Sequence, residues 1–187
     1  LGDVYKRQPF FMTFQPKDGS GFQAIGLHNI AKWPQWESIA PDVREGVEVV
    51  GNVLPFRTNR YVLDELIDWS RVPDDPIFQL VFPQQGMLDD SEYREVHSLL
   101  RGSEGAEAMS SAVNRIRLNL NPHPAGQLTH NVPTVGGERV EGIQHKYRET
   151  VLFFPSQGQT CHAYCTYCYR WAQFVGLEGL KFQEKEN

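Results

Sequence analysis

Cysteine is scarce in this chain, and long apolar runs are absent. The 187 residues include only three cysteines, all of them between Cys161 and Cys168. An odd and tightly clustered set does not build a disulfide framework, so in a reducing compartment we expect a metal site. No apolar run approaches the roughly 18 residues that a bilayer span needs, and the N-terminus lacks a signal-peptide pattern. We therefore expect a cytoplasmic protein without a membrane partner.

Positive charge is also in short supply. Lysine and arginine number 18 against 23 aspartate and glutamate residues, which gives a formal net charge of −5. Nucleic-acid-binding domains usually carry a basic excess, so we expect no nucleic-acid partner. Hydrophobic residues make up 40% of the chain and charged residues 22%, a balance typical of globular rather than disordered proteins.

The two ends of the chain do not resemble natural ends. The first residue is Leu1, and residues 1–8 resemble a translated sequencing adapter. We expect these residues to be a non-native leader that has no part in the fold. Residues 182–187 complete no element that the pattern reveals. A short natural protein with a polar tail is the alternative, but we expect the front part of a longer, truncated reading frame.

Residues 9–140 predict a mostly helical N-terminal region. Pro41 suits a first helical turn, because its missing N–H would have no partner there. Apolar residues at helical spacing follow it as far as Pro55: Val43, Val47, Val50 and Leu54. A second short helical or turn segment is predicted around residues 61–67.

Further along, prolines interrupt the helical pattern before it resumes. Residues 70–90 predict a loop in which the apolar run Phe78–Phe82 could be extended. Ser91 is a candidate N-cap for a helix that ends by Gly102. Another polar helix is predicted over 103–118, ended before Pro122.

A composition rich in proline and glycine over residues 119–146 predicts a linker, and we place a boundary near residue 140. The apolar run Val151–Phe154 follows and predicts a buried strand, such as the first strand of a parallel sheet. The cysteines come directly after it. Barrels and open α/β folds place active sites at the carboxyl ends of such strands.

The three cysteines have iron–sulfur spacing. Three residues separate Cys161 from Cys165, and two separate Cys165 from Cys168. Thiolates are the usual protein ligands of iron–sulfur clusters. Three of them can hold three irons of a [4Fe–4S] cluster and leave the fourth free to chelate S-adenosylmethionine. An electron from the cluster can then cleave the sulfonium bond to give a 5′-deoxyadenosyl radical.

The segment Cys161-His-Ala-Tyr-Cys165-Thr-Tyr-Cys168 resembles the CxxxCxΦC motif of the radical S-adenosylmethionine superfamily. The resemblance implies that Tyr167, at the aromatic position, lies beside the adenine of the cofactor. A closer resemblance, over roughly residues 35–176, is to the lysine 2,3-aminomutase family. It rests on these segments: Asp64, Asp74-Asp75-Pro76-Ile77 and Pro83, the triplet His145-Lys146-Tyr147, the strand, the cysteine loop and Arg170.

That family resemblance implies an α/β protein in which a helical N-terminal region precedes a partial (β/α) barrel that begins over residues 141–187 and is truncated here. It implies an isomerase that moves an amino group by radical chemistry. Arg170 would bind the substrate carboxylate, a task that suits a guanidinium, and Tyr147 would contact pyridoxal phosphate. The implied partners are an amino-acid substrate and an electron donor such as flavodoxin or ferredoxin, with a homo-oligomer left open. No catalytic residue is assigned.

The sequence departs from the family at three points. Family members commonly have three consecutive arginines after the loop, whereas this chain has Arg170-Trp171-Ala172. A family arginine that helps to hold the cofactor phosphate falls at Thr150. The lysine that forms the Schiff base lies far downstream in the family, so we expect this chain to lack its counterpart and to be inactive alone.

Two alternatives follow from the same residues. A radical S-adenosylmethionine enzyme without pyridoxal phosphate could act on another substrate, such as a peptide or protein side chain. A non-catalytic zinc module would need a fourth ligand, for which His162 or His145 could be proposed. Zinc sites usually pair two cysteines with a distant second pair, and the chain has no second pair.

Overall fold

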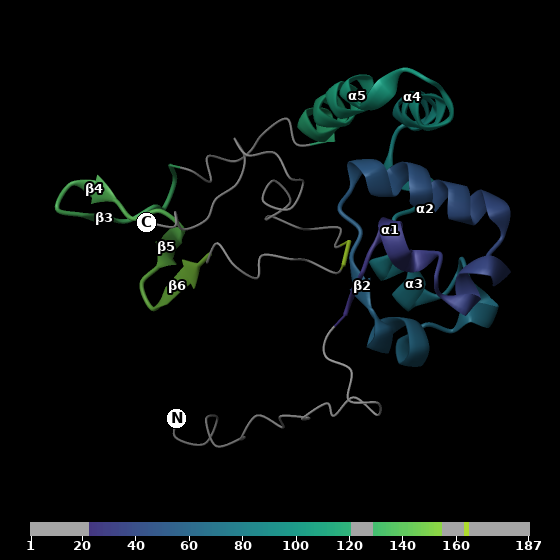
Figure 1. Cartoon of the computed structure of the whole chain (residues 1–187). Helices are drawn as coiled ribbons and strands as arrows, with labels where there is room; N and C mark the ends of the chain where they lie inside the picture. Colours follow the sequence, from purple (N-terminus) through teal and green to yellow (C-terminus); the bar gives the residue numbers. More distant parts are fainter. Residues whose placement is uncertain (1–22, 121–128, 155–162, 165–187) are drawn as a thin grey trace.

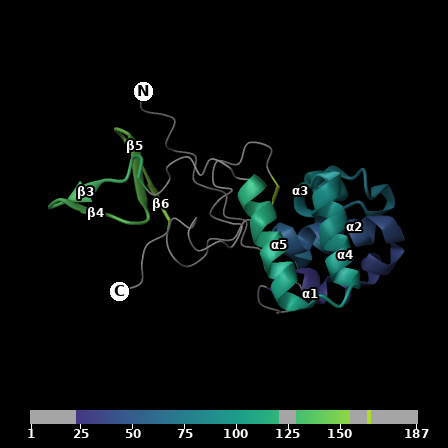
Figure 2. The ribbon, with the colours of Figure 1, turned by 90° about the horizontal axis from the view of Figure 1, so that it is seen from above.

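The computed structural model describes residues 23–120, 129–154 and 163–164. In this part of the chain the fold is mixed and mostly helical, with three short two-stranded antiparallel sheets. Figure 1 shows the helices gathered in one body, with the strands of the last two sheets off to one side, and Figure 2 shows the same separation from above.

The helical body, which we call the helical region (residues 23–120), contains one small sheet and a succession of helices. Its elements are β1 (Ala24–Ile25), α1 (Leu27–Ile30), η2 (Pro34–Ser38), α2 (Pro41–Val53), β2 (Thr58–Asn59), η3 (Val62–Leu66), η4 (Trp69–Arg71), α3 (Pro76–Val81), η5 (Gln85–Met87), α4 (Asp90–Arg101) and α5 (Gly105–Leu120). Strand β1 pairs with β2 in antiparallel fashion.

Helix α2 is the central element of this region, and its prediction is confirmed. Pro41 occupies its first turn, and the chain leaves the helix at Leu54, just before Pro55. The valine face is buried as the spacing predicts, with Val47 and Val50 fully inaccessible to solvent. Because α2 contributes residues to both core clusters, it joins them.

Helix α3 corrects a prediction. The apolar run Phe78–Phe82 was expected to be extended, but Pro76–Val81 is helical. Asp75 is the N-cap, and its Oδ1 accepts a hydrogen bond of 2.7 Å from the backbone N–H of Phe78. A capping carboxylate followed by proline at the first helical position starts a helix that the apolar run alone does not signal.

The two helices that follow agree with the prediction in number but not at every boundary. Helix α4 begins at Asp90, with Asp89 rather than Ser91 as its N-cap, and its C-cap is Gly102 as expected. The side chain of Asp89 makes no capping hydrogen bond. Helix α5 spans Gly105–Leu120, so it begins and ends two residues later than predicted.

Two clusters of buried side chains form the core of the helical region. The first surrounds Phe78 and Phe82, whose rings stack with centroids 4.4 Å apart and planes 14° apart. The second lies between α2, α4 and α5 and includes Val53, Val96 and Ile116. Packing of these faces, rather than isolated helix propensity, holds such short helices together.

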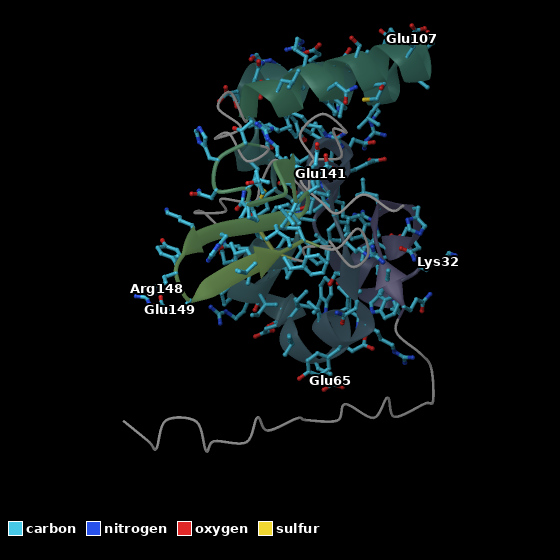
Figure 3. All side chains as sticks on the ribbon, turned by 90° about the vertical axis from the view of Figure 1, so that its left-hand side faces the viewer. Lys32, Glu65, Glu107, Glu141, Arg148 and Glu149 are labelled. Carbon is cyan, nitrogen blue, oxygen red and sulfur yellow. The ribbon has the colours of Figure 1, made fainter. Side chains whose placement is uncertain are left out.

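The strands outside the helical region form two hairpins. Strands β3 (Thr134–Val135) and β4 (Glu138–Arg139) pair with each other, and so do β5 (Ile143–Tyr147) and β6 (Thr150–Phe153). Figure 3 shows Arg148 and Glu149 at the tip of the β5–β6 hairpin, with both side chains pointing outward. The first hairpin lies before the boundary expected near residue 140, and the second lies after it.

The prediction of a buried parallel strand at Val151–Phe154 is wrong. Strand β6 runs antiparallel to β5, and Val151, Leu152 and Phe153 are all exposed, whereas Phe154 is buried. Two residues, Arg148 and Glu149, separate the strands, and so short a connection permits only an antiparallel partner. No closed barrel is present in residues 23–120, 129–154 and 163–164. In the same residues, no helix combines the length and the apolar character that crossing a membrane requires.

Candidate cysteine loop site

The predicted site residues fall mostly outside the part of the chain that the structure describes. Cys161, Cys165, Cys168, Tyr167 and Arg170 all lie beyond residues 23–120, 129–154 and 163–164. Their predicted roles therefore remain predictions. The structure does describe the three parts of the chain nearest to them: Tyr147 on β5, Phe154 after β6, and Ala163–Tyr164 inside the cysteine loop.

Tyr147 lies at the end of β5 next to the hairpin turn. Its ladder partner is Thr150, the first residue of β6. Its ring is exposed, and Lys146 Nζ lies 5.4 Å from the ring centroid. The structure thus pairs the two positions that the family resemblance associates with pyridoxal phosphate. The residue opposite the tyrosine is a short neutral threonine rather than a phosphate-binding arginine.

His145, one of the fourth ligands proposed for zinc, lies on β5 and contacts two main-chain carbonyls. Its backbone N–H donates to the carbonyl of Asn131 over 2.8 Å, and its Nε2 lies 3.5 Å from the carbonyl oxygen of Arg148. Among the described residues, no group of three or more His, Cys, Asp or Glu side chains could hold a metal ion. The metal site predicted at the cysteines lies outside those residues.

Phe154 fixes the end of the hairpin from which the chain enters the cysteine loop. Its side chain is buried, and its N–H donates to the carbonyl of Gly142 over 2.8 Å. Gly142 has a φ of 72°, in the left-handed region that glycine adopts without strain. This bond joins the residue before β5 to the residue after β6 and so closes the open end of the hairpin.

Tyr164 attaches the middle of the cysteine loop to the helical region. Its backbone N–H donates to the carbonyl of Leu80 over 2.8 Å, and its hydroxyl donates to the carbonyl of Pro55 over 2.8 Å. Leu80 is in the last turn of α3, where helix carbonyls have no partner within the helix. Pro55 follows the end of α2. One tyrosine therefore satisfies carbonyls at the ends of two different helices.

The side chain of Tyr164 also packs against apolar residues of the second core cluster. Figures 1 and 2 both show the short yellow segment 163–164 beside the helical region, on the side that faces the hairpins. No role for Tyr164 was expected from the sequence. The two carbonyls it contacts are main-chain groups, so residue types carry no signal of the contact.

A group of charged side chains lies elsewhere in the helical region, between α2 and α4. Glu45 Oε1 accepts from His97 Nε2 over 2.9 Å and from Arg101 Nη2 over 3.2 Å. The hydrogen bond from His97, supported by the charge of Arg101, lowers the pKa of the Glu45 carboxyl. The Ser70 hydroxyl likewise lowers the pKa of Asp68. Glu45 joins α2 to α4, whereas Asp68 is the N-cap of η4 and bonds to Ser70 within that turn.

The described residues thus supply an attachment point for the cysteine loop at Tyr164. Comparisons of the chain with protein-family models, with curated proteins and with solved structures found no match.

Proposed function

We propose that this chain belongs to a radical S-adenosylmethionine enzyme and that Cys161, Cys165 and Cys168 hold its [4Fe–4S] cluster. The observation that carries the proposal is the spacing of the three cysteines, with Tyr167 as the aromatic between the second and third. Attachment of the loop at Tyr164 is consistent with a loop that must hold three thiolates in a fixed arrangement.

The residues present fit such a cluster by their donor chemistry. Thiolates are its usual ligands. Three of them would leave the fourth iron free to chelate S-adenosylmethionine. When bound, the cluster supplies one electron that cleaves S-adenosylmethionine into methionine and a 5′-deoxyadenosyl radical. The chain supplies three thiolates, an adenine contact at Tyr167 and a guanidinium at Arg170 that would bind a substrate carboxylate.

The finer proposal is an aminomutase-type isomerase, in which the helical region and the antiparallel β5–β6 hairpin precede the parallel strands of a partial (β/α) barrel. The order of segments supports it: an N-terminal helical region, the triplet His145-Lys146-Tyr147, an apolar strand and then the cysteine loop. In this version Tyr147 contacts pyridoxal phosphate.

One observation favours a second candidate, an enzyme that uses the cluster without pyridoxal phosphate. Thr150 is the ladder partner of Tyr147, and its side chain carries no charge with which to bind a phosphate. A cation does lie over the Tyr147 ring, since Lys146 Nζ is 5.4 Å from its centroid. Lysine is a point charge rather than the bidentate fork that arginine offers to phosphate.

Anaerobic reconstitution with iron and sulfide tests the shared part of both candidates. We expect about four irons and four sulfides per chain, and an electron paramagnetic resonance spectrum of the reduced cluster that changes when S-adenosylmethionine is added. Cys161→Ser, Cys165→Ser and Cys168→Ser should each lose the cubane. One tightly bound zinc without sulfide would instead favour the zinc module.

Addition of pyridoxal phosphate to the reconstituted protein separates the two enzyme candidates. The aminomutase proposal expects binding that is weakened by Tyr147→Phe and strengthened by Thr150→Arg, which restores a phosphate partner. Tyr61→Phe, which removes a hydroxyl from an exposed tyrosine of the helical region, is the matched control. Binding that neither hairpin variant alters would contradict a role for Tyr147.

A further inference from the structure

We infer that the helical region is the docking platform of the cysteine loop, and that Tyr164 is the positioning residue that holds the loop there. This inference rests on the proposed function, because it assigns Tyr164 a task in cluster binding. Neither the spacing of the cysteines nor the family resemblance points to this residue; the contacts of its own atoms do.

The first step is that Tyr164 is held at two separate points. Its N–H bonds to the Leu80 carbonyl and its hydroxyl to the Pro55 carbonyl, each over 2.8 Å. One bond would fix a distance and leave the residue free to swing. Two bonds, one at the backbone and one at the tip of the ring, also fix its orientation.

The second step is that both acceptors belong to a rigid support. Leu80 is followed by Val81 and Phe82, and Pro55 is preceded by Leu54, all of which are buried in the core. The acceptors are the Leu80 carbonyl in the last turn of α3 and the Pro55 carbonyl just after α2. Helix α2 contributes to both core clusters and α3 to the first. A movement of Tyr164 would therefore break hydrogen bonds or disturb close-packed side chains.

The third step concerns the cysteines on either side in the sequence. Cys165 is the residue next to Tyr164, and Cys161 is three residues before it. Consecutive Cα atoms are about 3.8 Å apart, so fixing Tyr164 restricts where the neighbouring thiols can be. Restriction before binding reduces the conformational entropy that is lost when thiolates close around a cluster.

Tyr164→Phe is the most selective test of whether Tyr164 holds the loop in place. It removes only the hydrogen bond of the hydroxyl and keeps the ring and the backbone N–H. We expect the reconstituted cluster to lose iron to a chelator about fivefold faster, the factor that corresponds to one hydrogen bond of about 1 kcal/mol. Tyr164→Ala also loses the packing of the ring, so we expect its cluster to lose iron faster still. Tyr61→Phe should leave the rate unchanged.

A spectroscopic readout separates positioning from general destabilisation. In Tyr164→Phe we expect a broadened resonance spectrum of the reduced cluster and a weaker response to S-adenosylmethionine, while the helical circular dichroism and its melting temperature stay those of the parent. An unchanged spectrum together with an unchanged iron-loss rate in both Tyr164 variants would overturn the inference.

Thiol alkylation in the metal-free protein keeps this inference distinguishable from the proposed function. If the parent chain takes up no cubane, the proposed function fails, and the role of Tyr164 in holding the loop is judged by alkylation alone. We expect Cys165 to react severalfold faster with iodoacetamide in Tyr164→Ala than in the parent or in Tyr61→Phe. Equal rates in all three would show that Tyr164 does not restrain the loop.

Discussion

The helical region and the β5–β6 hairpin both carry apolar residues, but they use them differently. In the helical region phenylalanine, valine and isoleucine side chains are buried in two clusters joined by α2. In the hairpin Val151, Leu152 and Phe153 are exposed. Beyond α5, Phe154 is the only hydrophobic residue in the described part of the chain that is buried.

This difference shows that apolar sequence alone does not decide burial. Helices can cover one another on all sides, as α2, α4 and α5 do around Val53 and Ile116. A two-stranded hairpin has two open faces and needs a further layer before it can bury either. We therefore expect the helical region to fold by itself and the hairpin to depend on contacts outside the described residues.

The largest effect should come from paired phenylalanine truncations. Phe78→Ala removes a fully buried ring that stacks on Phe82, and we expect it to lower the free energy of unfolding by about 3–5 kcal/mol. Phe153→Ala removes an exposed ring and should change it by less than about 0.5 kcal/mol. Urea unfolding followed by circular dichroism measures both. Equal losses would show that the hairpin belongs to the same cooperative core.

A smaller loss should follow from removing the cap of α3. Asp75 is buried and accepts from the N–H of Phe78, so Asp75→Ala should lower the free energy of unfolding by about 2 kcal/mol. Asp89→Ala is the matched control, because Asp89 is the N-cap of α4 without a side-chain hydrogen bond. If both variants lower the free energy of unfolding by the same amount, the capping hydrogen bond of Asp75 does not stabilise α3.

Both the success and the failure of sequence reasoning can be understood at particular residues. Helix α2 could be predicted because its valines recur with helical period after Pro41. Helix α3 could not be predicted in this way, because Phe78–Phe82 is only five residues long and so short an apolar run does not distinguish a helix from a strand. The Asp75–Pro76 start was the usable signal. Strand β6 was predicted as a strand, but its exposure depends on which layer covers it, and local sequence does not contain that information.

The candidate site also has one part that the sequence could predict and one part that it could not. The cysteine spacing is a local pattern, so the sequence could predict the donor set. The contact of Tyr164 joins residues that are 109 positions apart and ends on a main-chain carbonyl. Nothing in the residue type of Pro55 or Leu80 marks those carbonyls as acceptors, so only the fold reveals them.

Two arginines of α5 provide a third comparison, between the side of this helix that packs on the core and the side that faces water. Arg117 is half-buried and donates from Nε to the Val53 carbonyl over 2.7 Å, at the end of α2. Arg117→Met should lower the free energy of unfolding by about 1 kcal/mol, since it leaves that carbonyl without its donor. Arg115→Met removes only an exposed ion pair with Glu95, so it should lower the free energy of unfolding by less. A larger loss at Arg115, measured by urea unfolding, would contradict this assignment.

The smallest effect should be a pH dependence confined to the helical region. The pKa of Glu45 is lowered by its hydrogen bond from His97, so the folded state favours the charged carboxylate. That stabilisation is present above the ordinary carboxyl pKa and is lost as the pH falls through the lowered value. We expect the melting temperature of the parent to exceed that of Glu45→Gln near neutral pH, and the gap to narrow on acidification. A gap that stays constant between about pH 6 and about pH 3 would contradict this linkage.

The 109-residue span between Tyr164 and Pro55 also has a consequence for the order of synthesis. The helical region ends at Leu120, so all of its core residues leave the ribosome before the cysteine loop does. At translation rates of about 5–20 residues per second, Tyr164 follows Leu120 by roughly 2–9 seconds. Helices can form and pack well within that delay. The growing chain therefore offers finished α2 and α3 carbonyls to a loop that has yet to be made.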